Sequence, residues 1–339
     1  MFVKEDFLSI LSKKTTKKNK YIVQLNYGYY RQYNERRHMS KQIVLETKNI
    51  WKKIGHHVIV NDVSFNLKEG EILGFIGPNG AGKTTTIKLI LGLQLPNGGE
   101  VKIAGYDLKN DFVKAISNVG AIIENPDLYM YMSGYENLKI AAKLHNIPLS
   151  RILEVVKLVG LENRIHDKVK KYSLGMRQRL GIAQAIIHKP KLLILDEPMN
   201  GLDPEGIKDL KVLLKKLAKE ENMAILISSH LLNELENICN CVCIMINGKI
   251  IRKISMSELK EITEKDDYIL EVSKVTLHRY LYDFKIIDNN HIKINTTKEN
   301  ISNILKTLLL NDIEIYGIRK ETTSLEEFFL SVAAKDEND

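Results

Sequence analysis

A glycine-rich stretch offers the clearest chemistry in the sequence. It matches the pattern G-x-x-x-x-G-K-[ST], and its members are Gly77, Pro78, Asn79, Gly80, Ala81, Gly82, Lys83 and Thr84. Glycines let a backbone wrap closely around a polyanion, with the N–H groups pointing inward. Lys83 would then reach the β- and γ-phosphates of a nucleotide, and the Thr84 hydroxyl would hold Mg²⁺. The stretch, with Thr85 directly after it, therefore predicts a nucleoside triphosphate site.

The residues on either side predict the elements that such a loop requires. Residues 71–76 form a short apolar run typical of a buried strand, and residues 85–91 are typical of a helix. A helix N-terminus carries partial positive charge where the phosphates would lie. A chance glycine-rich turn would not need these neighbours, so the context favours nucleotide binding.

A pair of acidic residues could supply the second half of a hydrolytic site. Asp196 and Glu197 follow Leu192–Leu195, a continuous apolar run typical of a strand that is buried on both sheet faces. Asp196 could hold Mg²⁺ through water, and Glu197 could take a proton from an attacking water as general base. The alternative is two surface acids at a strand end. Ligands bind at the carboxyl ends of strands in open α/β sheets, so the hydrolytic interpretation is favoured.

The stretch before this pair carries a family resemblance. Residues 172–180 resemble the L-S-G-G-Q signature, followed by x-Q-R, of ATP-binding cassette (ABC) ATPases. Ser173 and Gly175 match the signature, whereas Leu174 and Met176 depart from it. In that family the serine, the backbone amides and the helix N-terminus contact the γ-phosphate bound by the opposite subunit. The resemblance covers residues 43–258 and implies a dimer, expected to be a homodimer, in which two copies share each ATP.

Shorter motifs occur in the order of that family. Asp203 resembles the D-loop aspartate at the dimer contact, and His230 resembles the switch histidine that senses the γ-phosphate. Glu124 stands where the family usually has a glutamine, as in transporters that confer immunity to lantibiotic-type peptides. The resemblance therefore implies catalytic roles for Glu124, Glu197 and His230, with Glu124 near Mg²⁺ and the attacking water. The residue expected to contact adenine is Ile54, while stacking by Trp51, His56 or His57 stays open.

The alternation of strands and helices predicts an α/β fold. The resemblance specifies it as a P-loop ABC ATPase core over residues 42–258, with a mostly parallel sheet, an antiparallel β edge and a helical insertion at about 125–171. Short strands and helices over residues 266–335 predict a small C-terminal α+β domain, which ends in a helix at Leu325–Ala334. Residues 323–330 also resemble the closing segment of the bacitracin and lantibiotic exporter group.

Composition narrows the class of protein. The chain has 339 residues, 44% of them hydrophobic, yet no apolar run approaches the roughly 18 residues of a membrane span. Its first residues lack the apolar core of a secretory signal. Residues 1–38 hold nine basic and three acidic residues, so they supply +6 of the net charge of +8. The other residues carry about +2, and we therefore expect no direct binding of nucleic acid. We expect residues 1–38 to be a poorly ordered basic extension, or translation to begin at Met39.

The cysteines Cys239, Cys241 and Cys243 alternate along the chain. In an extended segment they would share one face. A metal site would need a fourth ligand, and the segment offers none at a sensible spacing. We therefore expect buried, reduced thiols.

The resemblance implies an ATP- and Mg²⁺-dependent ATPase subunit of an exporter. Such a subunit would lie at the cytoplasmic face of the membrane, beside separate permease subunits and a second nucleotide-binding subunit. The cargo expected from the resemblance is an antimicrobial peptide such as a lantibiotic or bacitracin. One alternative is an ABC ATPase that acts on ribosomes or nucleic acid. A second is a regulatory protein that binds nucleotide without turnover.

Overall fold

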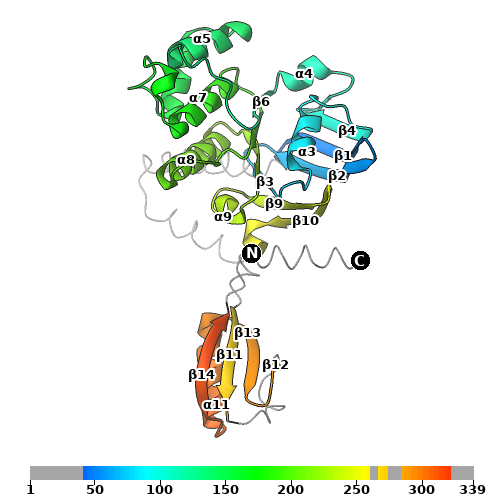
Figure 1. Cartoon of the computed structure of the whole chain (residues 1–339), viewed down its shortest axis with the longest axis vertical. Helices are drawn as coiled ribbons and strands as arrows, with labels where there is room; N and C mark the ends of the chain where they lie inside the picture. Colours follow the sequence, from blue (N-terminus) through cyan, green and yellow to red (C-terminus); the bar gives the residue numbers. More distant parts are fainter. Residues whose placement is uncertain (1–40, 260–265, 274–283, 322–339) are drawn as a thin grey trace, which may run out of the picture. The chain divides into compact units, whose positions relative to one another are not determined.

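The computed structural model describes residues 41–259, 266–273 and 284–321 (Figure 1). The basic extension predicted over residues 1–38 and the helix predicted at Leu325–Ala334 lie outside these residues. Among the residues described, no helix combines the length and the apolar character that a membrane crossing requires.

A six-stranded sheet carries the glycine-rich loop and the acidic pair. Its strand order is β10-β9-β3-β8-β7-β6, with parallel pairing throughout except for β10, which pairs antiparallel with β9. The strands are β3 (Ile72–Ile76), β6 (Val119–Ile122), β7 (Leu192–Asp196), β8 (Ala224–Ser229), β9 (Cys241–Ile246) and β10 (Lys249–Ser255). Every residue of β3, β7, β8 and β9 is buried, as expected where both faces of a parallel sheet are covered. The mostly parallel sheet predicted from the sequence is confirmed.

A second, antiparallel sheet forms the predicted β edge. Its order is β2-β1-β4-β5, and its strands are β1 (Ile43–Ile54), β2 (His57–Lys68), β4 (Gly98–Ile103) and β5 (Tyr106–Asp107). Helix α3 (Lys83–Ile90) buries Ile87 and Leu89 in the core cluster that contains residues from both sheets. Phe65 of β2 meets Phe75 of β3 edge-to-face, with ring centroids 5.0 Å apart. This packing anchors the helix that follows the glycine-rich loop.

The other helices between residues 112 and 235 lie around the two sheets (Figure 1). They are α4 (Phe112–Ile116), α5 (Gly134–Leu144), α6 (Ser150–Val159), the 3₁₀ turn η1 (Val169–Lys171), α7 (Leu174–Ile186), α8 (Pro204–Glu220) and α9 (Leu232–Leu235). The insertion predicted to be mostly helical from residue 125 begins its first helix only at Gly134. Ser133 and Glu136 form a capping box there, which fixes the start of α5. Asn137 then binds the preceding loop through both backbone groups of Tyr129.

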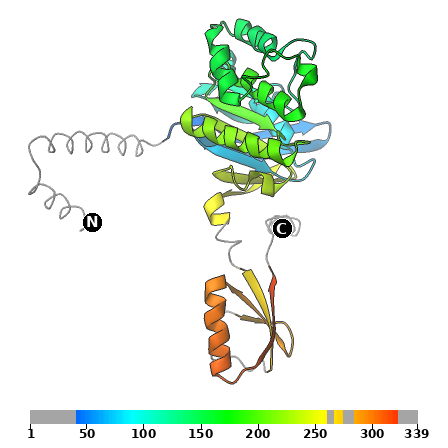
Figure 2. The ribbon, with the colours of Figure 1, turned by 90° about the vertical axis from the view of Figure 1, so that its left-hand side faces the viewer.

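The C-terminal part of the chain forms a separate small sheet with one helix. The antiparallel order is β12-β13-β11-β14, and the elements are β11 (Asp266–Val272), β12 (Phe284–Ile286), β13 (His291–Thr296), α11 (Lys298–Leu310) and β14 (Ile315–Glu321). Figure 2 shows α11 against one face of this sheet. Leu308 of α11 packs with Leu270 and Ile292 in a small core. This is the α+β arrangement predicted for this part of the chain, whereas the domain boundaries stay predictions.

The cysteines are buried, but they do not share one face. Cys241 and Cys243 lie on β9 and pack in the cluster that includes Phe75. Cys239 precedes the strand and packs with Leu235 in the other core cluster, so its predicted position on the same face is wrong. Burial raises the pKa of both strand cysteines to about 12, which keeps them as thiols at neutral pH. Within the described ranges, no group of three or more His, Cys, Asp or Glu side chains could hold a metal ion.

Candidate active site

The glycine-rich loop is held by close backbone contacts. Gly82 adopts a left-handed conformation with φ 97°, and a Cβ on it would lie 2.7 Å from the Ile59 carbonyl oxygen of β2. A Cβ on Gly77 would lie 2.3 Å from the Met245 carbonyl oxygen of β9. Any larger residue at either position would force the loop away from the strands. These glycines therefore fix the loop as a narrow turn between β3 and α3.

Lys83 points into this loop and is almost fully buried, with 6% of its side chain exposed. Its Nζ donates hydrogen bonds to the carbonyl oxygens of Gly77, at 2.6 Å, and Pro78, at 3.2 Å. The same nitrogen lies 3.6 Å from Oε1 of Glu197. The ammonium group is thus held between the loop and the acidic pair, where it can meet the phosphates of a bound nucleotide.

Thr84 and Asp196 bring hard oxygen atoms together. The Thr84 hydroxyl donates to Oδ2 of Asp196 at 2.8 Å, and the Asp196 residue is 2% exposed. Oδ1 of Asp196 accepts a short hydrogen bond from the Ser228 hydroxyl on β8. Hydroxyl and carboxylate oxygens are the ligands that Mg²⁺ prefers, and they adjoin the lysine that would bind the phosphates. The residues present therefore fit a Mg²⁺ ion bound together with nucleotide.

Glu197 lies between a lysine and a histidine. Its Oε2 is 2.8 Å from Nδ1 of His230, and its Oε1 faces Lys83. These residues line one pocket of about 410 Å³. The full lining is Ile59, Asn79, Gly80, Ala81, Gly82, Lys83, Thr84, Thr85, Glu197, Asn200 and His230. A carboxylate so placed, 19% exposed, can take a proton from a water molecule that enters the pocket.

The signature residues line a different pocket. Ser173 caps the N-terminus of α7 by accepting a hydrogen bond from Met176 N at 3.3 Å, and Asp203 caps α8 by accepting one from Gly206 N at 3.0 Å. Ser173, Gly175 and Asp203 all line this pocket of about 190 Å³. None of its lining residues belongs to the pocket of the glycine-rich loop. Within one chain, the two halves of the predicted ATP site are therefore not brought together.

Two other predicted contacts also lie outside the loop pocket. Glu124 follows β6, is exposed and adopts a left-handed backbone with φ 63°. Ile54 is half exposed at the end of β1, and the Trp51 indole lies against Gly98, whose Cβ would approach the indole nitrogen within 2.4 Å. Neither Glu124, Ile54 nor Trp51 is among the residues that line the pocket. Their proposed roles stay predictions.

Three residues of the site escaped the sequence-based reasoning. Ile59 and Asn200 line the loop pocket, and Ser228 binds the acidic pair from the neighbouring strand. A signal for Ser228 was present: it is polar and ends an apolar run, residues 224–227, that is parallel to β7. Parallel strands align their carboxyl ends, so polar residues at those ends meet.

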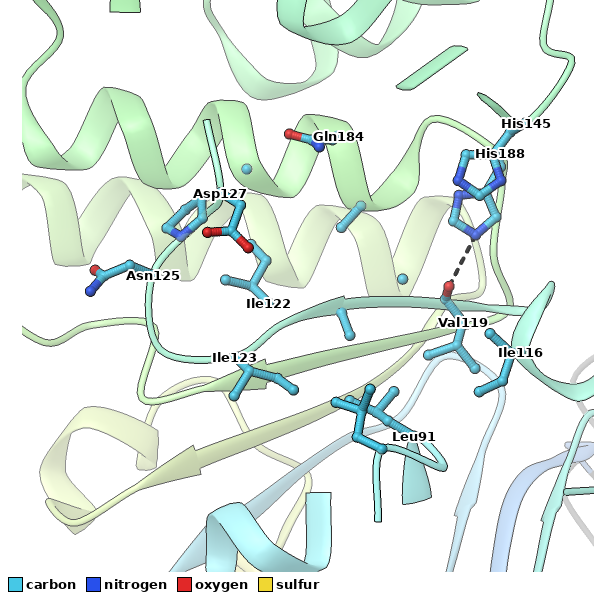
Figure 3. A pocket seen from close by; sticks show the side chains of 16 residues that line it. Leu91, Ile116, Val119, Ile122, Ile123, Asn125, Asp127, His145, Gln184 and His188 are labelled. Carbon is cyan, nitrogen blue, oxygen red and sulfur yellow. Dashed lines mark hydrogen bonds between the residues drawn. The ribbon is translucent and has the colours of Figure 1, made fainter. Parts of the chain in front are cut away.

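A groove of about 480 Å³ lies where the edge strand β6 meets α7 (Figure 3). Its apolar lining includes Leu91, Leu93, Ile116, Val119, Ile122 and Ile123. Asp127, Gln184, His145 and His188 add polar groups to the lining. The two histidine rings are stacked, with centroids 4.3 Å apart and an angle of 9° between the ring planes. An apolar surface with a few polar groups suits the apolar side of a partner segment.

The His188 side chain predicts a pH dependence of folding stability. Its Nε2 donates to the Val119 carbonyl oxygen at 3.1 Å, whereas its buried Nδ1 has no hydrogen-bond partner among the described residues. Burial, and then neighbouring His145, lower the pKa of His188. As pH falls, the folded state thus binds fewer protons at His188 than the unfolded state does. The contribution of the neutral His188 ring to folding stability is therefore present at neutral pH and is lost as pH falls below the unfolded pKa of about 6.5.

Replacing His188 by glutamine should remove this dependence. Glutamine can donate to Val119 but does not titrate. Melting temperatures measured between about pH 7.5 and pH 5.5 should fall less steeply in His188→Gln than in wild type. If the melting temperatures of the two proteins fell equally with pH, His188 would not be the source of the pH dependence.

Comparison with known proteins gives three informative relatives. Residues 60–200 match the sequence pattern of the family described as "ABC transporter". The chain is 45% identical to the uncharacterized ABC transporter ATP-binding protein YhcH of Bacillus subtilis (strain 168), over 86% of this chain and 96% of YhcH. It is 38% identical to the bacitracin transport ATP-binding protein BcrA of Enterococcus faecalis, over 86% and 96% of the two chains. It is 41% identical to the lantibiotic transport ATP-binding protein SrtF of Streptococcus pyogenes, over 61% and 89%.

Solved structures agree with this comparison. An ATP-binding subunit of an ABC transporter superposes with a TM-score of 0.58 and 31% identity, covering 65% of this chain and 92% of its own. A dimeric ATP-binding cassette in a post-hydrolysis state, bound to ADP and Pi, superposes with a TM-score of 0.56 and 25% identity, covering 62% and 98% of the two chains.

Proposed function

The chain belongs to the ABC transporter family and is an ATP-hydrolysing, ATP-binding subunit, and from this premise we propose that it powers export of an antimicrobial peptide through separate membrane subunits. The observation that carries ATP turnover is the contact of Glu197 with both Lys83 and His230 at the glycine-rich loop. The names of BcrA and SrtF support bacitracin or a lantibiotic as the class of cargo. On this account the chain works at the cytoplasmic face of the membrane, bound to its permease.

Each residue at the loop then has a role in binding or chemistry. The loop amides and Lys83, which already lies in the loop, would bind the phosphates, while Thr84 and Asp196 would hold Mg²⁺. When bound, Mg²⁺ would offset the negative charge of the phosphates. Glu197 takes the proton of the attacking water, and the contact of His230 with Glu197 keeps that carboxylate oriented.

A second copy would complete the site. Ser173 caps a helix whose N-terminus is a good anion site, yet it lines a pocket apart from the loop of its own chain. We therefore propose that Ser173 and Gly175 of one copy contact the ATP bound by the loop of the other, with Asp203 at the contact. The dimeric cassette among the similar structures supports this arrangement. ATP would join the copies, and hydrolysis would release them.

Cells test the proposed export directly. The chain, expressed with its permease in a peptide-sensitive strain, should raise the concentration of bacitracin or a lantibiotic that stops growth. The Glu197→Gln variant should not raise it, because transport would lack ATP turnover. Wild type that hydrolyses ATP but protects against no such peptide would exclude this cargo class while leaving the ATPase assignment intact.

The groove between β6 and α7 is the surface we propose for the permease. Its apolar lining suits an apolar segment (Figure 3), and its lining residues include Gln184 of α7 and His145 at the C-terminal end of α5. Leu93 lines the groove and is 63% exposed, so a charge there should not disturb folding. Leu93→Asp should lose copurification with the permease while still binding ATP, because binding would bury the carboxylate.

Leu95 supplies the matched control. It lies two residues further along the same loop, is 77% exposed and is not among the residues that line the groove. Leu95→Asp should still copurify with the permease. Equal retention of the permease by both variants would rule the groove out as the docking surface.

A further inference from the structure

Ser228 stands directly beside the acidic pair. It is the fifth residue of β8, and its Cα is paired with that of Asp196 in the parallel β7–β8 ladder. The Ser228 side chain is fully buried. No motif in the sequence assigned it a role, yet the register of two strands places it against the residue proposed to hold Mg²⁺.

The Ser228 hydroxyl serves both acidic residues at once. It donates a short hydrogen bond to Oδ1 of Asp196 and accepts one from the backbone N–H of Glu197 at 2.9 Å. Oδ2 of Asp196 accepts from Thr84 on the other side. The carboxylate of Asp196 is therefore held by one hydroxyl at each oxygen, with both hydroxyls coming from other elements of the fold.

The bond to the Glu197 backbone acts where the chain turns sharply. Glu197 has φ 49°, a left-handed conformation that costs free energy in a residue with a side chain. In this turn its carboxylate reaches Lys83 on one side and His230 on the other. Ser228 stabilises the N–H group at the start of the turn, so it helps to hold the general base in place.

The neighbouring serine does not share this role. The Ser229 hydroxyl bonds instead to Glu234 at 2.6 Å and to the backbone of Leu231, within the turn that leads to α9. An apolar residue at position 228 would leave Oδ1 of Asp196 and the N–H of Glu197 without the partner they now share.

We propose that Ser228 is a positioning residue that sets the Asp196 carboxylate toward Mg²⁺ and the Glu197 carboxylate toward the attacking water. This inference rests on the proposed Mg·ATP site. Ser228 is not among the residues that line the loop pocket, so it acts through its bonds to the two acidic residues. Hydrogen-bond partners of ligating carboxylates orient them, and loss of such a partner lowers metal affinity or activity by about 10- to 100-fold.

Three variants test the proposal. Ser228→Ala removes the hydroxyl, and Ser228→Cys keeps a side chain of similar size with a weaker donor. Thr47→Val is the matched control, since Thr47 is also a buried strand hydroxyl, bonded to the backbone of Phe65 in the antiparallel sheet. For each variant we would measure melting temperature, ATP turnover against Mg²⁺ concentration, and binding of a fluorescent ATP analogue with Mg²⁺ and with EDTA.

In Ser228→Ala the Mg²⁺ concentration for half-maximal turnover should rise about 10- to 100-fold. Binding of the analogue to Ser228→Ala in EDTA should match wild type. In Ser228→Cys the Mg²⁺ concentration for half-maximal turnover should lie between those of wild type and Ser228→Ala. Thr47→Val should lose thermal stability but keep the wild-type Mg²⁺ dependence. An unchanged Mg²⁺ dependence in Ser228→Ala, or an equal loss of binding with and without Mg²⁺, would overturn the inference. A wild type that fails to bind Mg·ATP would instead overturn the proposed function.

Discussion

Replacing Glu197 by glutamine is expected to lower ATP turnover by about 10²- to 10⁴-fold while ATP stays bound. Glutamine keeps the length of the side chain and can still bond to His230, but its neutral amide cannot take a proton from water. Lys83, Thr84 and Asp196, which we propose to bind Mg·ATP, are unchanged. Phosphate release at steady state measures the loss, and equilibrium binding of a fluorescent ATP analogue measures the retained affinity.

A matched control separates the general base from loss of a charge. Glu162 is an exposed carboxylate in the helical part of the cassette and is not among the residues that line the loop pocket. Glu162→Gln should turn over ATP like wild type. If Glu197→Gln also turned over ATP at the wild-type rate, Glu197 would not be the general base.

Replacing Lys83 by alanine is expected to weaken ATP binding by about 10- to 100-fold. Hydrogen bonds to charged groups contribute about 1.5–3 kcal/mol, and about 1.4 kcal/mol corresponds to a factor of ten in affinity. The ammonium is also the cation that faces the Glu197 carboxylate at 3.6 Å. Without it, two like charges, the carboxylate and the γ-phosphate, would lie close together in the same pocket. Equilibrium binding with and without Mg²⁺ measures the effect.

Lys88 provides the control on the same helix. It lies in the last turn of α3, away from the loop, and is not among the residues that line the pocket. Lys88→Ala should therefore bind ATP with wild-type affinity. If Lys83→Ala bound ATP as tightly as Lys88→Ala, the loop would not be the phosphate site.

Local patterns predicted the loop and its flanking elements well. The glycines, Lys83 and Thr84 follow one another in the chain, so their spacing alone defines the turn between β3 and α3. The apolar run before Asp196 likewise forms β7, which is buried on both faces. In both cases the residue types that mark the feature are consecutive in the chain, even though distant residues such as Ile59 and Met245 enclose the loop in the fold.

Other features depend on contacts between distant segments. Ser228 meets Asp196 only because β7 and β8 pair in a particular register, which no local spacing reveals. Cys239 lies two residues before β9 begins. The alternation of side chains that holds within a strand therefore does not apply to it, and it packs in a different core cluster from Cys241 and Cys243. The insertion predicted at about 125–171 gave no start for its first helix, which the Ser133 capping box sets at Gly134.

The central claim is that the loop of one copy and the Ser173 helix tip of another bind the same ATP. The molecular mass of Glu197→Gln in solution, measured by analytical ultracentrifugation with Mg·ATP, tests it most directly. We predict a dimer, and we predict that adding Ser173→Glu returns the protein to a monomer because a carboxylate would face the γ-phosphate. Glu197→Gln that stays monomeric with Mg·ATP bound, or a dimer that tolerates Ser173→Glu, would contradict the account.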